Sequence, residues 1–210
     1  CDFGQEINKE INTKVIRYFK SIKKENILGI NNLTPSYNKL IVSFDLKKTN
    51  FKNIKKEIEN LNVINSDFLS NQRIEIPTCC DENFSLDIER LEQKLKINRE
   101  KIYENFFDKE FFCYMTGFIA GMPFLGDLDK NMRVKRLETP RVKVPKGSVG
   151  LTEQFANIYT FESPGGWNII GNTPIDIFDS SKEKNPNLIN PGDLIIFKKI
   201  TKDQYLNYND

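Results

Sequence analysis

FFCYMTGFIAGMPFLGDL (residues 111–128), TPRVKVPKGSVGL (139–151) and ESPGGWNIIGNTP (162–174) interleave strand-like runs with glycine and proline. Glycine permits positive φ and close backbone approach, whereas proline fixes φ and removes a hydrogen-bond donor. Short β-rich runs separated by such turns are typical of closed or barrel-like β domains. We therefore predict a β domain whose loops are rigid and tightly turned, and such loops commonly carry function. Its predicted strands are Phe111–Met115, Arg141–Val144, Ser148–Leu151, Ala156–Phe161, Trp167–Gly171 and Asp193–Lys198.

The chain before residue 111 has a mixed α/β pattern. Apolar residues at helical spacing predict an amphipathic helix over residues 6–24 and a shorter one over 51–61. Strands are predicted at Leu40–Leu46 and Arg73–Thr78, and 77–83 is predicted to be a connector. Two further helices are predicted around 88–95 and 102–107, capped by Ser85 and Asn98 respectively.

The composition excludes several classes of protein. With 39% hydrophobic and 29% charged residues and a net charge of +2, the chain resembles an ordinary globular protein and not a dedicated nucleic-acid binder. No apolar run is long enough for a membrane span, and we expect a cytoplasmic protein. The four cysteines have no metal-ligand spacing, so no metal site is predicted. Because the chain has no histidine, Ser-His-Asp and Cys-His mechanisms are excluded.

Short motifs follow one another along nearly the whole chain: Pro35-Ser36-Tyr37, Gly117-Phe118, Gly121, Pro123-Phe124-Leu125-Gly126, Thr139-Pro140-Arg141, Val144-Pro145, Gly147-Ser148-Val149, Glu162-Ser163-Pro164-Gly165-Gly166-Trp167 and Asn190-Pro191-Gly192-Asp193. In this order they resemble the 5-oxoprolinase B-subunit family, which includes the sporulation-kinase inhibitor KipI and proteins labelled allophanate hydrolase subunit 1. Ala120, Met122 and Thr160 depart from the residues usual in the family.

The resemblance implies an α+β protein of two domains. Residues 1–77 would form a small ferredoxin-like α/β domain that lacks its first strand, and residues 78–210 a cyclophilin-like β-barrel domain. It further implies one component of a complex, which works with the A and C subunits of 5-oxoprolinase in the ATP-dependent hydrolysis of 5-oxoproline to L-glutamate. Because the resemblance implies a heteromer, we expect the isolated chain to be inactive. The sequence contains neither a dinucleotide fingerprint nor a Walker lysine with which to bind ATP by itself.

Two other functions fit the same resemblance. A KipI-like protein would bind a sensor histidine kinase through an exposed apolar patch. The third possible function is that of a component of an allophanate hydrolase. The Ser-Ser-Lys residues of amidases and a biotin attachment motif are, however, not evident in the sequence.

The ESPGGW segment is the first candidate substrate site. Backbone N–H groups at Gly165 and Gly166 can receive a carboxylate or an oxyanion, while Trp167 can wall a pocket and Glu162, beside Ser163, can hold a polar group. Alternatively, the glycines form a structural hairpin turn and the only tryptophan is a core anchor.

Two cations on one predicted strand form the second candidate. Arg141 and Lys143 alternate with valines and would share a face, which suits a substrate carboxylate or phosphate. They are equally consistent with solvent-facing charges. A third candidate, for partner binding, is the apolar set Phe118, Met122, Phe124 and Leu125, which would instead fill the barrel core if the loop lies inside.

Overall fold

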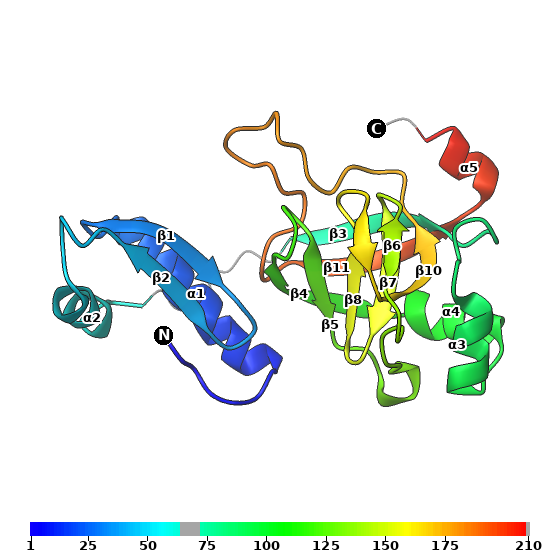
Figure 1. The fold of residues 1–210 in the computed structure, drawn as a ribbon, viewed down its shortest axis with the longest axis horizontal. Coiled ribbons are helices and arrows are strands. Elements are labelled where there is room, and N and C mark those ends of the chain that lie inside the picture. Colours follow the sequence, from blue (N-terminus) through cyan, green and yellow to red (C-terminus); the bar gives the residue numbers. More distant parts are fainter. Residues whose placement is uncertain (64–71, 209–210) are drawn as a thin grey trace. The chain divides into compact units, whose positions relative to one another are not determined.

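The chain divides into two compact units, Cys1–Asn71 and Gln72–Asp210. The computed structural model describes residues 1–63 and 72–208 of them (Figure 1). Among the described residues, no helix is both long enough and apolar enough to cross a membrane.

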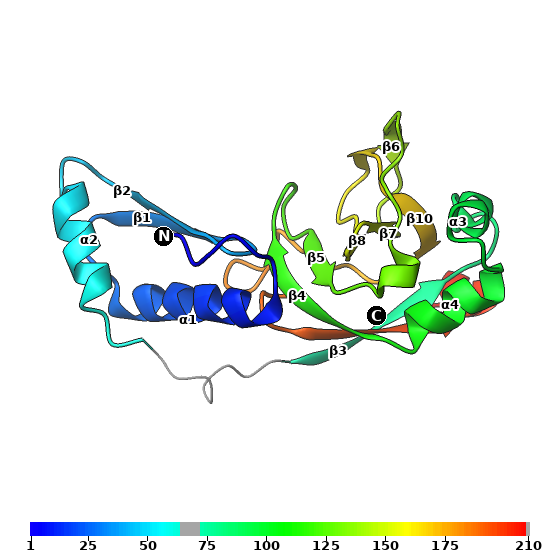
Figure 2. The same cartoon turned by 90° about the horizontal axis from the view of Figure 1, so that it is seen from below.

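The first unit packs two helices with a two-stranded antiparallel sheet. Helix α1 (Lys9–Glu25) lies along the ribbon of β1 (Ile30–Pro35) and β2 (Leu40–Phe44), and α2 (Phe51–Glu59) follows (Figure 2). Asn8 and Asn50 cap the two helices by accepting a hydrogen bond from a backbone N–H of the first turn. The buried residues Val15, Ile22 and Leu40 form the core of this unit.

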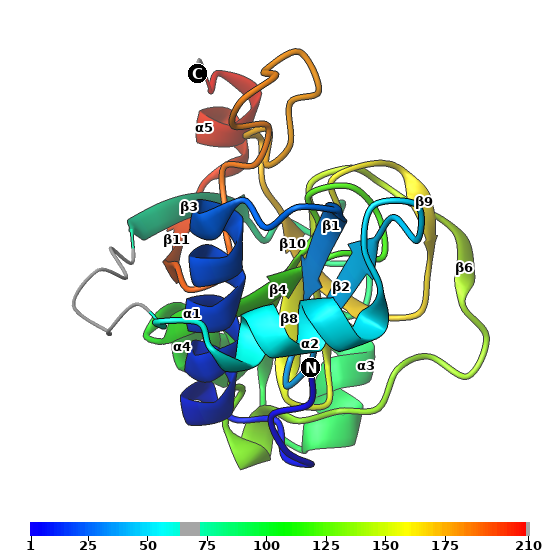
Figure 3. The same cartoon turned by 90° about the vertical axis from the view of Figure 1, so that its left-hand side faces the viewer.

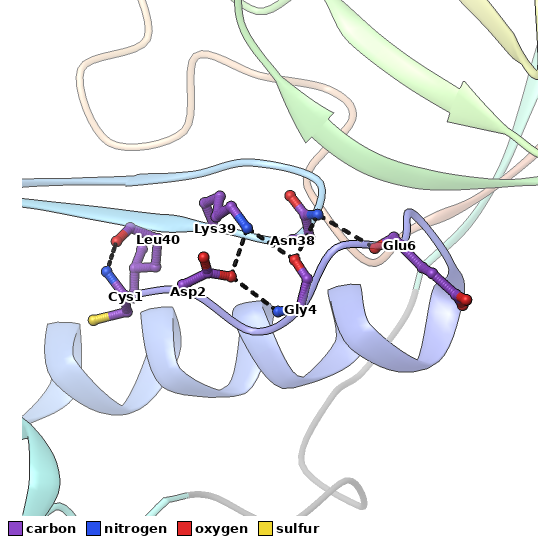
Figure 4. Close-up of polar contacts among 7 residues, drawn as sticks. All are labelled: Cys1, Asp2, Gly4, Glu6, Asn38, Lys39 and Leu40. Carbon is purple, nitrogen blue, oxygen red and sulfur yellow. Dashed lines mark hydrogen bonds and ion pairs between the residues drawn. The ribbon is translucent and has the colours of Figure 1, made fainter.

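The first residues run antiparallel to the start of β2 (Figure 4). The N-terminal amino group of Cys1 donates to the Leu40 carbonyl over 2.8 Å, and the Leu40 N–H donates back to the Cys1 carbonyl over 2.9 Å. The ammonium group of Lys39 contacts the Asp2 carboxylate and the Gly4 carbonyl, and its hydrogen bond to Asp2 lowers the pKa of that carboxyl group. These contacts fix the N-terminal segment on the sheet edge.

The first unit differs from the predicted arrangement. The predicted helices and the strand from Leu40 are confirmed, but β1 was not predicted because INNLTP has little strand character. The described elements follow the order α1-β1-β2-α2, and the ferredoxin-like prediction is not confirmed.

The second unit is built on a closed barrel with the strand order β10-β3-β11-β4-β5-β8-β7. All neighbouring strands are antiparallel except β3 and β11, which pair in parallel from Arg73↔Leu194 to Cys79↔Ile200. This barrel fits the cyclophilin-like prediction. Its strands are β3 (Arg73–Cys79), β4 (Glu110–Thr116), β5 (Pro123–Gly126), β7 (Ser148–Thr152), β8 (Phe155–Ile158), β10 (Asn168–Asn172) and β11 (Leu194–Ile200).

The position of strand β3 shows that the domain boundary differs from the predicted one. The strand predicted at Arg73–Thr78 is confirmed and extends to Cys79. The predicted division assigns residues 73–77 to the first domain, but β3 lies between β10 and β11 in the barrel. The division falls between Asn71 and Gln72 and not after residue 77. Local sequence could not reveal this, because the parallel partner of β3 lies near the other end of the chain.

Three helices accompany the barrel. Helices α3 (Ile88–Leu95) and α4 (Arg99–Phe107) pack against each other and against β10 and β11, and α5 (Lys202–Leu206) packs near β3 (Figure 1). Asn98 caps α4 as predicted. The predicted cap at Ser85 is wrong, because the Ser85 hydroxyl instead donates to the Ile170 carbonyl over 2.8 Å.

A separate two-stranded ribbon lies outside the barrel and carries most of the predicted site. It pairs β6 (Arg141–Val144) with β9 (Ser163–Gly165), which run side by side at one edge of the unit (Figure 3). The sequence predicted β6 but neither β9 nor β5, which are short and contain proline.

Candidate functional site

Residues 162–167, here called the glycine loop, need both of their glycines for close packing. A Cβ atom at Gly165 would lie 2.1 Å from the Tyr159 hydroxyl oxygen, which leaves no room for any side chain. Gly166 is buried beneath Arg136 and Pro140, and a Cβ atom there would lie 3.1 Å from Nη2 of Arg136. The glycines therefore let Tyr159 and Arg136 approach the loop backbone from two directions.

Arg141 is held by a carboxylate of the protein itself. Its Nη1 and Nη2 donate to the two Asp87 oxygens over 2.9 and 2.7 Å, a bidentate pair. The Asp87 side chain is only 5% exposed and the Arg141 side chain 29%. Asp87 also accepts a hydrogen bond of 2.7 Å from the Ile169 N–H. This pair ties β6 to the start of α3 and to β10.

Lys143 forms a different ion pair, 2.9 Å long, with Glu162 at the exposed surface. The pairing of β6 with β9 shifts register between Arg141 and Val144, so the alternation on which the shared face was predicted is interrupted. The two cations consequently contact different carboxylates instead of forming one anion clamp.

Trp167 belongs to a small apolar cluster distinct from the main barrel core. Its ring meets that of Phe124 edge to face, with centroids 5.6 Å apart. The other members are Met122, Val144, Tyr159 and Ile169, which are buried, and Ile119, which is partly buried. Trp167 is only half-buried, so it links this cluster to the surface beside the glycine loop.

Tyr159 places a phenolic oxygen under the glycine loop. Burial raises the pKa of Tyr159 above its ordinary value, while the Asn157 side chain, the Trp167 backbone and the charges of Arg136 and Arg141 oppose that rise. Both arginines therefore act on this region electrostatically. A phenol in this setting can serve as a hydrogen-bond donor to an anion.

Buried oxygen atoms around the loop lack hydrogen-bond partners among the described residues. They are Oδ1 of Asn157, Oδ1 of Asn168 and Oγ of Ser163. Each such group costs about 1–3 kcal/mol, and native proteins keep few of them.

The predicted partner-binding residues separate in the structure. Leu125 is buried in the main barrel core and Met122 in the small cluster, so the alternative that these residues fill the interior is confirmed for both. Phe124 is partly buried against Trp167. Phe118 alone is widely exposed, at 77%, and it adopts a φ of 71°, which is uncommon for an aromatic residue.

Sequence reasoning missed three residues of this site: Asp87, Tyr159 and Arg136. Asp87 lies at the N-terminus of a helix, where an acidic residue is ordinarily read as a cap. Tyr159 resembles any apolar strand residue. Arg136 lies in a segment without regular structure. The one sequence feature that could have pointed to it is its closeness to the motif Thr139-Pro140-Arg141.

Taken together, the loop backbone lies against the Tyr159 phenol and the Arg136 guanidinium, and Trp167 connects it to an apolar cluster. These groups suit a small anion that carries an apolar ring. The Cys113 thiol is buried in the main barrel core, and burial raises its pKa far above the ordinary value. The site is therefore suited to binding and to charge stabilisation.

Comparison with known proteins agrees with this fold. The family described as "Carboxyltransferase domain, subdomain C and D" matches residues 1–189. The chain is 31% identical over 220 residues to the 5-oxoprolinase B subunit of Bacillus subtilis, an alignment that covers 99% of this chain and 91% of the relative. It is 35% identical over 175 residues to the protein of the same name from Haemophilus influenzae, covering 82% of this chain and 78% of that one.

The fold and the motifs thus define a protein of the carboxyltransferase subdomain C and D class. Within that class, the chain belongs to the 5-oxoprolinase B-subunit family.

Solved structures show the same fold. TTHA0988 superposes with a TM-score of 0.86 at 24% identity, and the match covers 95% of this chain but only 39% of that one. PH0987 of Pyrococcus horikoshii matches with a TM-score of 0.61 at 33% identity, covering 97% of this chain and 94% of that one. Urea amidolyase of Kluyveromyces lactis matches with a TM-score of 0.78 at 18% identity, covering 98% of this chain and 14% of that one.

Proposed function

We propose that this chain is the B subunit of a 5-oxoprolinase, a heteromer that hydrolyses 5-oxoproline to L-glutamate at the expense of ATP. The observation that carries the proposal is the 31% identity to a 5-oxoprolinase B subunit over nearly the whole of both chains. A relative of matching length supports an equivalent role, alongside the A and C subunits.

The chemistry of the lactam explains why ATP is needed. The amide of a five-membered lactam is resonance-stabilised and unstrained, so water attacks it slowly. Phosphorylation of the lactam oxygen by ATP, which releases ADP, makes the ring carbon electrophilic. One water adds to that carbon, and the C–N bond breaks with protonation of the nitrogen to give an acyl phosphate. A second water then hydrolyses the acyl phosphate to the free carboxylate of L-glutamate and phosphate. ATP would be bound elsewhere in the complex, because this sequence has no phosphate-binding loop.

In this proposal the glycine loop supplies charge stabilisation and not a nucleophile. Backbone N–H groups of Gly165 and Gly166 would face the developing oxyanion, and Trp167 with Phe124 would shield the ring from water. The isolated chain is expected to be inactive, because other subunits would phosphorylate the lactam and position the attacking water.

The test is ATP-dependent glutamate release from 5-oxoproline. This chain alone, its A and C partners together, and all three proteins would be compared, with assembly checked by size-exclusion chromatography. Activity that requires all three supports the proposal. An assembled but inactive mixture contradicts it.

A second function, inhibition of a sensor histidine kinase, is favoured by one feature. Phe118 is widely exposed and Phe161 is 44% exposed, and their segments are joined by the Thr160 hydroxyl, which donates to the Ala120 carbonyl over 2.7 Å. Such a patch can dock on a partner. If it does, purified chain slows kinase autophosphorylation and Phe118→Ser does not; equal inhibition by both would exclude this surface.

A further inference from the structure

The glycine loop is surrounded by three cations, of which two are already neutralised. Arg141 pairs with Asp87 and Lys143 with Glu162. The guanidinium of Arg136 has no ion pair or hydrogen bond to any other residue within ranges 1–63 and 72–208. One positive charge beside the loop is therefore available to an external anion.

Arg136 is also held in place. Its preceding residue, Lys135, accepts a hydrogen bond of 3.2 Å from Asn168, and the following Leu137 N–H donates to the Gly166 carbonyl over 2.7 Å. The backbone on both sides of Arg136 is thus bound to the segment that contains the glycine loop. Fixing the backbone in advance reduces the entropy lost when a ligand binds.

The position of the guanidinium depends on the absence of a side chain at Gly166. Nη2 and Nε lie 3.1 and 3.2 Å from the point where a Cβ atom would be, so the guanidinium rests against the loop backbone. A planar guanidinium offers two parallel N–H donors that match a carboxylate. Trp167, which follows Gly166, is half-buried against the small apolar cluster.

From these contacts we infer that Arg136 binds the carboxylate of a small ring-shaped monoanion at the glycine loop. Arg141 is then a positioning residue that fixes β6 through Asp87. The identity of that anion as 5-oxoproline rests on the proposed function, whereas the carboxylate site itself rests on the geometry of Arg136.

The protein contains its own probe for this site, because Trp167 is the only tryptophan. Its fluorescence would be titrated with 5-oxoproline and with 2-pyrrolidinone, the same lactam without the carboxylate. Saturable binding of 5-oxoproline, and binding of 2-pyrrolidinone at least tenfold weaker, is expected. Arg136→Gln should raise the Kd for 5-oxoproline at least tenfold, and Arg136→Lys should raise it less. The matched control is Lys130→Gln, which removes an exposed positive charge nearby in the sequence and should leave the Kd unchanged.

The same variants would be assayed in the assembled mixture of all three proteins. Arg136→Gln should raise the KM for 5-oxoproline at least tenfold, with a smaller effect on kcat. An unchanged KM in an active mixture overturns the inference and leaves the proposed function standing. An inactive mixture together with Arg136-dependent binding of 5-oxoproline overturns the proposed function and leaves the carboxylate site. The carboxylate site is overturned if 5-oxoproline shows neither saturable binding in the fluorescence titration nor saturation in the turnover assay. It is also overturned if 2-pyrrolidinone binds as tightly as 5-oxoproline.

Discussion

At the scale of single residues, the ion pair of Asp87 and Arg141 holds the ribbon to the barrel. Asp87 is almost completely buried, so removing its partner would strand a charge away from water. We expect Arg141→Met to destabilise the second unit by about 3 kcal/mol. Urea unfolding followed by Trp167 fluorescence measures this directly, because Trp167 lies in that unit.

The double variant Asp87→Asn with Arg141→Met is the control for this pair. Without the carboxylate no charge is stranded, so the double variant should be more stable than Arg141→Met alone. If the two variants unfold at the same urea concentration, the pair contributes by packing and not by charge compensation.

The close approach of Tyr159 to Gly165 gives a second prediction at this scale. Gly165→Ala would place a methyl group 2.1 Å from the phenolic oxygen, and relief of that overlap should cost about 1–3 kcal/mol. At Gly117 the nearest atom is the flexible end of Met115, at 3.0 Å, so Gly117→Ala should change stability far less. Thermal unfolding of the two variants compares them; equal melting temperatures would refute the packing argument.

At the scale of elements, helix α4 is attached to the segment that precedes α3 by the Tyr103 hydroxyl, which donates to Oγ of Ser85 over 3.0 Å. Burial raises the pKa of Tyr103 to about 12, against about 10 in an unfolded chain. Because the folded state favours the protonated phenol, its stabilisation is complete below about pH 10 and is lost as the pH rises to about 12.

Tyr103→Phe tests this contribution. Urea midpoints at pH 8, 10 and 11 should fall with pH in both proteins, since burial also raises the pKa of Tyr159 and Tyr205. The fall should be shallower in Tyr103→Phe, which cannot ionise at that position. Parallel curves would show that Tyr103 does not contribute to alkaline unfolding.

The ribbon of β6 and β9 also shows which structural features can be predicted from the sequence. Residues 141–144 were predicted as a strand and form β6, because alternating valines and the flanking prolines are local signals. The ribbon partner Ser163–Gly165 was missed, since SPG has no strand propensity and pairs only through its contact with β6. The motif that contains Gly165 and Gly166 is visible in the sequence, whereas Arg136 is placed beside Gly166 only by a contact between segments distant in sequence.

At the scale of the whole molecule, the barrel depends on a strand that precedes the predicted domain boundary. β3 forms a continuous parallel pairing with β11 over Arg73–Cys79 and also joins β10, so it closes the barrel on both sides. Ile76 on this strand is completely buried in the main core. Loss of β3 would leave two unpaired edges and an open core.

A fragment comprising residues 72–210 should therefore fold alone, whereas a fragment comprising 78–210 should not. The second keeps only Thr78 and Cys79 of β3. It therefore retains the single pairing with β10 at Asn172↔Cys79 but leaves the edge of β11 unpaired from Leu194 to Lys198. Trp167 fluorescence and a urea titration distinguish the two: a cooperative transition is expected for 72–210 and a featureless profile for 78–210. Should 78–210 unfold cooperatively at the midpoint of 72–210, β3 would be dispensable for closing the barrel.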